Sequence, residues 1–171
     1  MGLLEDEMKF LVLSLFVVLS ACSGVVPADR FQPKPVTTEL PTLHWPPVII
    51  EISDERPNNA VAHEDLVSAV EGTIRQALNQ PSNPGNGWSL KVVILRHEAM
   101  FPGGGSPWWV GTTSFRAVLL TTDGKEYRWV VDDVNKEWNV WGYGSGTDAA
   151  QHSLREALRK LLRQMHADVR A

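Results

Sequence analysis

The chain has 171 residues, of which 43% are hydrophobic and 21% are charged, and its formal net charge is −4. This length suits one globular domain. The acidic balance argues against a nucleic-acid-binding protein, which carries clustered Lys and Arg. One cysteine alone excludes an internal disulfide. We therefore expect a single domain without a nucleic-acid partner, preceded by any targeting segment.

The first residues have the pattern of an export signal. Lys9 supplies positive charge, residues 10–19 form a short apolar run, and two small residues precede Cys22. The run is shorter than the roughly 20 residues of a membrane span, so it is typical of a signal peptide. We expect residues 1–21 to be removed, and Met8 to be the true start because an acidic tripeptide precedes it.

The end of this segment, Leu19-Ser20-Ala21-Cys22, resembles the lipobox of bacterial lipoproteins. The resemblance implies a lipid on Cys22, where two or more acyl chains form a stable anchor at ~0.8 kcal/mol per buried methylene. In the sorting rule that comes with the resemblance, Ser23 implies the outer membrane, with the domain facing the periplasm. The alternative is an unmodified cysteine inside a cleaved or anchoring helix. Beyond Cys22, residues 22–43 contain four prolines, which predicts an extended tether.

Residues 44–171 are predicted to form one domain that begins with a strand and a helix. A β-branched run at 48–52 predicts the first strand, and turn residues follow it. Apolar residues at helical spacing predict a helix over 61–79, and alternation predicts the second strand over 88–98.

The second half of the domain is predicted to be a hairpin followed by a helix. Strands over 113–122 and 125–134 flank Asp123-Gly124, a strong hairpin signal. A second apolar stripe predicts a helix over 147–168, with Thr147 as its N-cap.

A two-residue turn at Asp123-Gly124 would set the register of this hairpin. Leu120 would then face Tyr127, and Val118 would face Trp129. The core face of the hairpin is accordingly predicted to carry Val118, Leu120, Tyr127, Trp129 and Val131. The opposite face, which carries Phe115, Ala117, Leu119 and Val130 among charged residues, is neither clearly core nor clearly solvent.

The element order β-α-β-β-β-α predicts a two-layer α+β domain. A right-handed crossover would make the first two strands parallel, and the hairpin strands are antiparallel. Each helix has one apolar stripe, so both are expected to cover the same face of a four-stranded mixed sheet.

The element order and the end of the first strand resemble the YajG-like lipoproteins of proteobacteria. The residues that carry this resemblance are the lipobox, Val48-Ile49-Ile50-Glu51-Ile52-Ser53-Asp54-Glu55-Arg56 and the amphipathic helix that follows. The resemblance implies an envelope lipoprotein without a known activity, so it adds a location and a fold but no mechanism.

Tryptophan is abundant, with seven residues in the chain, all of them in the predicted domain. Trp108 and Trp109 follow a glycine-rich loop, and Trp138 and Trp141 lie near a second one. Trp combines a large apolar body with an N–H donor, which suits protein, glycan and membrane contacts. These four residues are candidate partner-binding residues on flexible loops. Packing of Trp108 or Trp109 on the sheet edge, and of Trp138 and Trp141 in the core, remains the alternative.

A row of arginines on the last predicted helix is the second candidate site. Arg155, Arg159 and Arg163 recur every four residues and so share one flank. They suit an anionic envelope component. The alternative is a solvated helix face, which commonly carries such charges.

The sequence offers no set of catalytic residues. Its five His lack metal-ligand spacing such as His-Glu-x-x-His, and there is no Gly-x-Ser-x-Gly elbow. Asp132 and Asp133 point to opposite faces of a strand, and Asp54 and Arg56 suit a turn with a salt bridge. We therefore expect no enzyme, no cofactor and no metal site.

The leading hypothesis is an outer-membrane lipoprotein whose domain binds a protein partner or an envelope component. The Trp residues and the half-apolar face of the sheet are its expected contact surfaces. The second hypothesis is a glycan-binding module for peptidoglycan or lipopolysaccharide.

Overall fold

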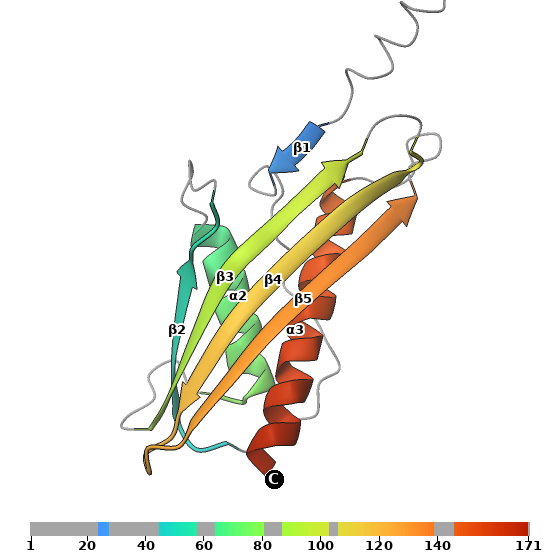
Figure 1. The fold of residues 1–171 in the computed structure, drawn as a ribbon. Helices are drawn as coiled ribbons and strands as arrows, with labels where there is room; N and C mark the ends of the chain where they lie inside the picture. Colours follow the sequence, from blue (N-terminus) through green and yellow to red (C-terminus); the bar gives the residue numbers. More distant parts are fainter. Residues whose placement is uncertain are drawn as a thin grey trace, which may run out of the picture.

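The computed structural model describes residues 24–27, 45–57, 64–80, 87–102, 106–138 and 146–170. They form a mixed sheet with two helices on one face (Figure 1). The strands are β1 (Gly24–Pro27), β2 (Val48–Asp54), β3 (Trp88–Phe101), β4 (Trp108–Leu120) and β5 (Glu126–Trp138), and the helices are α2 (Glu64–Ala77) and α3 (Gly146–Arg170). The predicted two-layer α+β class and the order β-α-β-β-β-α from β2 onward are confirmed.

Strand β3 organises the sheet because it pairs with three other strands. On one edge it pairs antiparallel with β4, which pairs in turn with β5. On the other edge β2 runs parallel along its first half, as a right-handed crossover through α2 requires. A bulge between Ile94 and Arg96 shifts the alternation, so that His97 and Ala99 point to the helix side.

The last residues of β3 pair with β1, a strand that no sequence pattern predicts. Gly24 is the register partner of Phe101, and Pro27 is the partner of Glu98. These four residues lie in the segment expected to be an extended tether, and they join the sheet instead. The rest of that segment, residues 22, 23 and 28–43, lies outside the described residues.

The hairpin between β4 and β5 has a register that differs by one residue from the predicted one. Leu119, and not Leu120, is the partner of Tyr127. The loop has three residues between Thr121 and Lys125, because Gly124 adopts φ of 84° and its N–H donates to the Thr121 carbonyl at 3.0 Å. A type I turn followed by a left-handed glycine is the usual three-residue hairpin.

This shift reverses the predicted faces of β4, because side chains alternate along a strand. Phe115, Ala117 and Leu119 are fully buried, whereas Val118 and Leu120 lie on the other face. For β5 the prediction was right, since Trp129 and Val131 are buried and Val130 is exposed.

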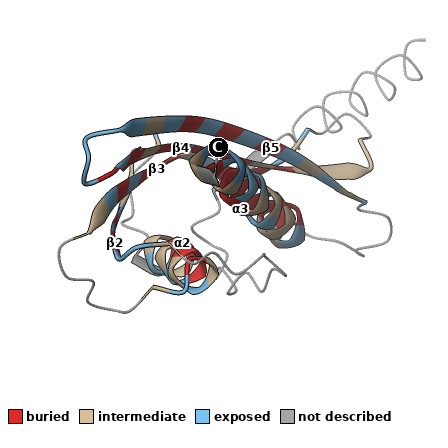
Figure 2. Ribbon diagram, turned by 90° about the horizontal axis from the view of Figure 1, so that it is seen from below, coloured by how far each residue is buried: buried red, intermediate tan, exposed pale blue. Residues whose placement is uncertain are grey.

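The core lies between the sheet and the helices (Figure 2). Helix α2 packs on β2, and α3 packs on β4 and β5. The predicted apolar stripes face the core. Val67 and Ala77 of α2 are partly buried, and the other stripe residues are buried: Leu66, Val70 and Ile74 of α2, Leu78 just after it, and Leu154, Ala157, Leu158, Leu161, Leu162 and Met165 of α3.

Helix α3 lies very close to β4 at Gly111. A Cβ atom built at Gly111 would lie 2.0 Å from the carbonyl oxygen of Ala149. Only glycine therefore lets the first turns of α3 rest on β4 at this distance.

The strands of the sheet are longer than the sequence predicts. β4 begins at Trp108, five residues before the predicted start, and β5 continues to Trp138. Trp108, Trp109 and Trp138 are thus strand residues and not loop residues, which fixes the face on which each side chain lies.

Candidate functional site

The sheet face opposite the helices, called the open face, has no helix over it in the described part of the chain (Figure 2). It is defined by the residues that point away from α2 and α3: Ile49 and Glu51 on β2, Lys91, Arg96, Glu98 and Met100 on β3, Trp108, Thr112, Arg116, Val118 and Leu120 on β4, and Glu126, Arg128, Val130, Asp132, Val134, Lys136 and Trp138 on β5.

The open face gathers the exposed apolar side chains of the domain. The large apolar residues that are exposed in the described ranges all point to this side of the sheet: Ile49, Met100, Leu120, Val130, Val134 and Trp138. Val130 and Val134 are 63% and 60% exposed. Contiguous exposed apolar surface on a folded domain typically marks an interaction site.

A shallow hollow of about 580 Å³ lies at the hairpin end of the open face. Three aliphatic and three basic side chains line it, together with a serine, a glutamate and a tryptophan: Val118, Leu120, Val130, Lys91, Arg116, Arg128, Ser89, Glu126 and Trp129. Its volume falls in the range of small-ligand pockets, but it opens on a sheet surface. This shape suits a side chain of a partner better than an enclosed small molecule.

Four cations of the open face, Lys91, Arg96, Arg116 and Arg128, are paired with carboxylates of the same face or its rim. Arg116 contacts Glu55 at 3.0 Å, and Arg128 contacts Glu126. The Glu126 carboxylate raises the pKa of Arg128 above its ordinary value. Such exposed pairs stabilise the fold only weakly, because water screens them. The mixture of signs gives no concentrated positive field for a polyanion.

The adjacent pair Trp108 and Trp109 is divided between the two faces of the sheet. Trp108 lies on the open-face side and packs edge to face against Trp138, with ring centroids 4.3 Å apart. Trp109 lies on the helix side, where its ring centroid is 5.2 Å from that of Phe101. It also packs against the buried Ala99 and Ala150. The structure thus brings Trp108 and Trp138 together, and it places Trp109 apart from them. Trp141 lies outside the described residues.

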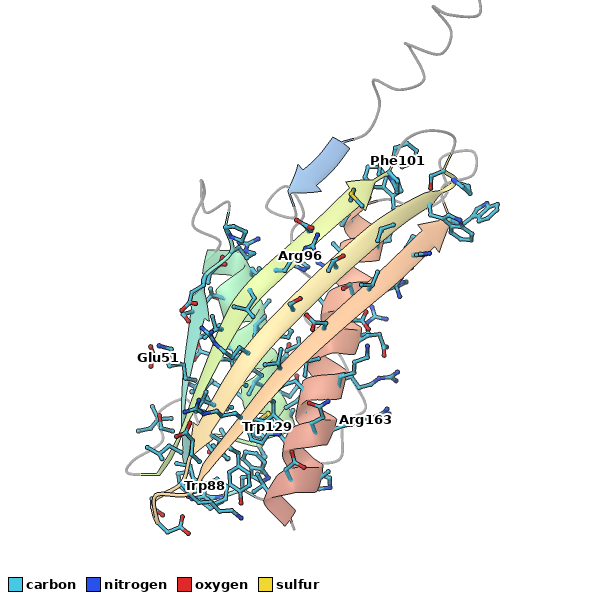
Figure 3. The ribbon with its side chains drawn as sticks, viewed as in Figure 1. Glu51, Trp88, Arg96, Phe101, Trp129 and Arg163 are labelled. Atoms are coloured by element: carbon cyan, nitrogen blue, oxygen red, sulfur yellow. The ribbon has the colours of Figure 1, made fainter. Side chains whose placement is uncertain are left out.

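The arginine row of α3 runs away from the Trp residues. At 1.5 Å per residue, Arg155 and Arg163 lie roughly 14 and 25 Å along the helix from Gly146, which packs on Trp109. Arg159 contacts Glu156 at 2.5 Å, and Arg155 and Arg163 are exposed. Figure 3 shows Arg163 pointing away from the sheet. The row and the Trp pair do not form one site.

The polar residues on the helix side form a buried row that the sequence pattern did not reveal. His97, Thr113 and Asp133 are cross-strand neighbours on β3, β4 and β5, and all are buried. The His97 ring nitrogen lies 3.0 Å from the Thr113 hydroxyl. Lys160 donates to the Asp133 carboxylate at 2.5 Å, and Ser153 donates to the Asp133 carbonyl. The row is covered by α3, so it serves packing of the helix.

Asp132 and Asp133 point to opposite faces, as predicted, with Asp132 exposed and Asp133 buried. Among the described residues, no group of three or more His, Cys, Asp or Glu is placed to hold a metal ion.

Asp54 and Arg56 form a bidentate ion pair at 2.8 and 2.5 Å, as the turn after the first strand suggests. Both side chains are largely buried, and Arg56 also donates to the His97 carbonyl. The pair fills the stretch of β3 edge between β2 and β1, so its role is to hold strands together.

The described helices include none that is both long and apolar enough to cross a membrane. Cys22, the predicted lipid-bearing residue, lies outside the described residues.

The chain matches no protein-family model and no curated protein sequence. The resemblance to YajG-like lipoproteins therefore stays an expectation.

Solved structures do show similarity. A protein from Xanthomonas campestris of the DUF330 family is 15% identical with a TM-score of 0.47, over 82% of this chain and 95% of that one. A putative lipoprotein from Caulobacter crescentus is 14% identical with a TM-score of 0.46, over 70% and 89%. The PelC dodecamer from Paraburkholderia phytofirmans is 12% identical with a TM-score of 0.40, over 73% and 93%. At these identities and scores, the function has to be argued from the residues of this chain.

Proposed function

We propose that this protein is an envelope lipoprotein, anchored through Cys22, whose domain binds a protein partner on the open face in an accessory or assembly role. The observation that carries the proposal is the concentration of exposed apolar residues on that one face. The lipobox-like segment supports the anchor, and Ser23 supports the outer membrane with the domain in the periplasm.

The character of the open face favours a protein as the partner. Val118, Leu120 and Val130 surround the hollow, with Arg116 and Arg128 beside them. Protein interfaces combine an apolar centre, in which Arg is enriched, with a polar rim. A glycan site would instead present a flat aromatic ring for stacking, whereas Trp108 and Trp138 pack edge to face at 78°. The geometry therefore favours a protein partner over a glycan.

Site-specific photo-crosslinking in cells tests the binding surface. A photo-reactive residue at Val134 should give an adduct of defined mass, because this position is exposed at the centre of β5. The matched control is the same residue at Gln164, which is exposed on α3. A second change, Val130→Lys, should weaken the adduct while changing stability by less than about 0.5 kcal/mol.

Two outcomes would refute this surface: an equal adduct pattern at both positions, or an adduct at Val134 that Val130→Lys leaves unchanged. A saturable fluorescence change with muropeptides or lipopolysaccharide would favour the glycan hypothesis instead. The anchor is tested separately by Cys22→Ser, which should release a folded domain from membranes. Membrane association that survives this substitution and a high-salt wash would refute the anchor.

A further inference from the structure

The position of β1 fixes where the anchored end of the chain meets the domain. Gly24 pairs with Phe101, the last residue of β3. Cys22 precedes Gly24 by two residues, which span at most about 7 Å when fully extended. A lipid on Cys22 would thus hold one particular end of the sheet close to the bilayer, and no long spacer separates the two.

That end of the sheet carries an aromatic cluster, here called the Trp end: Phe101, Trp108, Trp109 and Trp138. Phe101 closes β3, Trp108 opens β4 and Trp138 closes β5, so three strand ends meet there. Trp138 is 49% exposed, and Lys136 is exposed two positions earlier on β5. Met100 is exposed on β3, in the same register row as Lys136. Figure 3 shows Phe101 at this end of the sheet and Trp88 at the other.

The aromatic residues at the opposite end of the sheet pack in or against the core. Trp45 and Trp88 pack edge to face at 5.6 Å and lie against the core. Trp129 is only 5% exposed, and its ring N–H donates to Asp168 at 2.7 Å. Among the described residues, the one exposed Trp therefore lies at the end to which β1 brings the anchor.

Trp and Lys are well suited to the boundary between lipid headgroups and acyl chains. The indole ring has an apolar body and a polar N–H, and it concentrates at membrane interfaces. A Lys stem packs on apolar surface while its ammonium reaches the headgroups. Once a lipid tethers the chain, even a weak surface contact becomes intramolecular and is favoured by effective concentration.

We propose that the Trp end is a membrane-contact surface, with Trp108 and Trp138 seated among the lipid headgroups next to the acylated Cys22. The inference rests on the lipid anchor proposed above. The domain then stands upright on the membrane. β4 has 13 residues, so the hairpin at Thr121–Lys125 lies roughly 40 Å away at 3.4 Å per residue.

Quenching of Trp fluorescence by brominated lipids tests this placement. The full acylated chain is reconstituted into phosphatidylethanolamine–phosphatidylglycerol vesicles that contain brominated phosphatidylcholine. The wild-type protein should be quenched, and Trp108→Phe combined with Trp138→Phe should lose most of this quenching. The matched control combines Trp45→Phe with Trp88→Phe, which removes an edge-to-face pair at the far end and should leave the lipid quenching intact. Urea unfolding of each variant shows that it folds.

The outcomes separate the inference from the anchor on which it rests. If the chain is acylated and vesicle-bound but unquenched, or if the Trp108/Trp138 variant is quenched as before, the Trp end does not contact lipid and only this inference falls. If mass spectrometry shows no acyl group on Cys22, the anchor fails and the inference fails with it. A protein adduct from a photo-reactive residue at position 138 in cells, in place of a lipid adduct, would also overturn the inference.

Discussion

The contact between α3 and β4 predicts a large effect of a very small substitution. In Gly111→Ala the new Cβ would lie 2.0 Å from the carbonyl oxygen of Ala149 and 2.2 Å from its carbonyl carbon. Ordinary contact begins at 3.4 Å, so the start of α3 must retreat by about 1.4 Å, which already forfeits much of the dispersion energy along the gap. Both contacting atoms belong to backbone, so no side-chain rotation relieves the clash.

We expect Gly111→Ala to lower the free energy of unfolding by about 3 kcal/mol, the upper part of the range for overpacked cores. In a domain of this size that corresponds to a melting temperature lower by about 10 °C. Urea unfolding followed by circular dichroism measures the effect on the domain without its signal segment.

Gly72→Ala provides the matched control because it is the same substitution in open space. Gly72 lies on the exposed side of α2, and a Cβ there has no atom within 4 Å. Ala is the better helix former, so this variant should be more stable by about 0.5–1 kcal/mol. A Gly111→Ala domain as stable as the wild type, with Gly72→Ala behaving as expected, would refute the close contact of α3 with β4.

Three further predictions concern the core, the junction between strands and the turn. Phe115→Ala should cost about 3–5 kcal/mol in urea unfolding, whereas Val130→Ala on the open face should change stability by less than about 0.5 kcal/mol. Asp54→Ala should cost about 1–3 kcal/mol because it removes the carboxylate partner of the largely buried Arg56, and adding Arg56→Ala should restore part of this loss. The Thr121 hydroxyl beside Asp123 lowers the pKa of that carboxyl. Ionised Asp123 thus stabilises the fold above its unfolded-state pKa, and this contribution is lost as the pH falls through the folded-state pKa; melting curves of Asp123→Asn should show a smaller loss in acid.

The apolar stripes predicted the helices well because a helix on a sheet must bury one continuous face. Every stripe residue of α3, from Leu154 to Met165, is buried as expected. The register of the hairpin, in contrast, does not follow from such patterns. Asp123-Gly124 predicts a turn, but two-residue and three-residue loops both suit these residues. One added residue in the loop moves Phe115 from one face of the sheet to the other. Alternation alone could not show which face of β4 is buried, because both faces carry aliphatic residues.

The exposed apolar face of the sheet was predictable as a property but not as a list of residues. A half-apolar sheet face was expected, and Val130 was placed on it correctly, whereas Phe115, Ala117 and Leu119, which were placed on the same face, are buried in the core. Ile49 and Val134 are also exposed, yet only the strand pairing shows that they share a face with Leu120. β1 was missed because its four residues carry no alternation, and their pairing with β3 depends on residues about 75 positions away.

The two proposed surfaces are compatible because they lie on different parts of the sheet. The Trp end is formed by the ends of three strands, whereas the partner surface around Val130 lies on the broad side of the sheet. Trp138 and Val130 are eight residues apart on β5, so their Cα atoms are roughly 27 Å apart at 3.4 Å per residue. If the Trp end rests on the membrane, the strands run along the membrane normal and the open face looks sideways, where a partner can reach it without displacing lipid. Sites this far apart and without shared contacts act additively. Replacing Trp108 and Trp138 should therefore change lipid contact and leave the Val134 adduct intact, while Val130→Lys should do the reverse; strong coupling between them would mean that one ligand covers both surfaces.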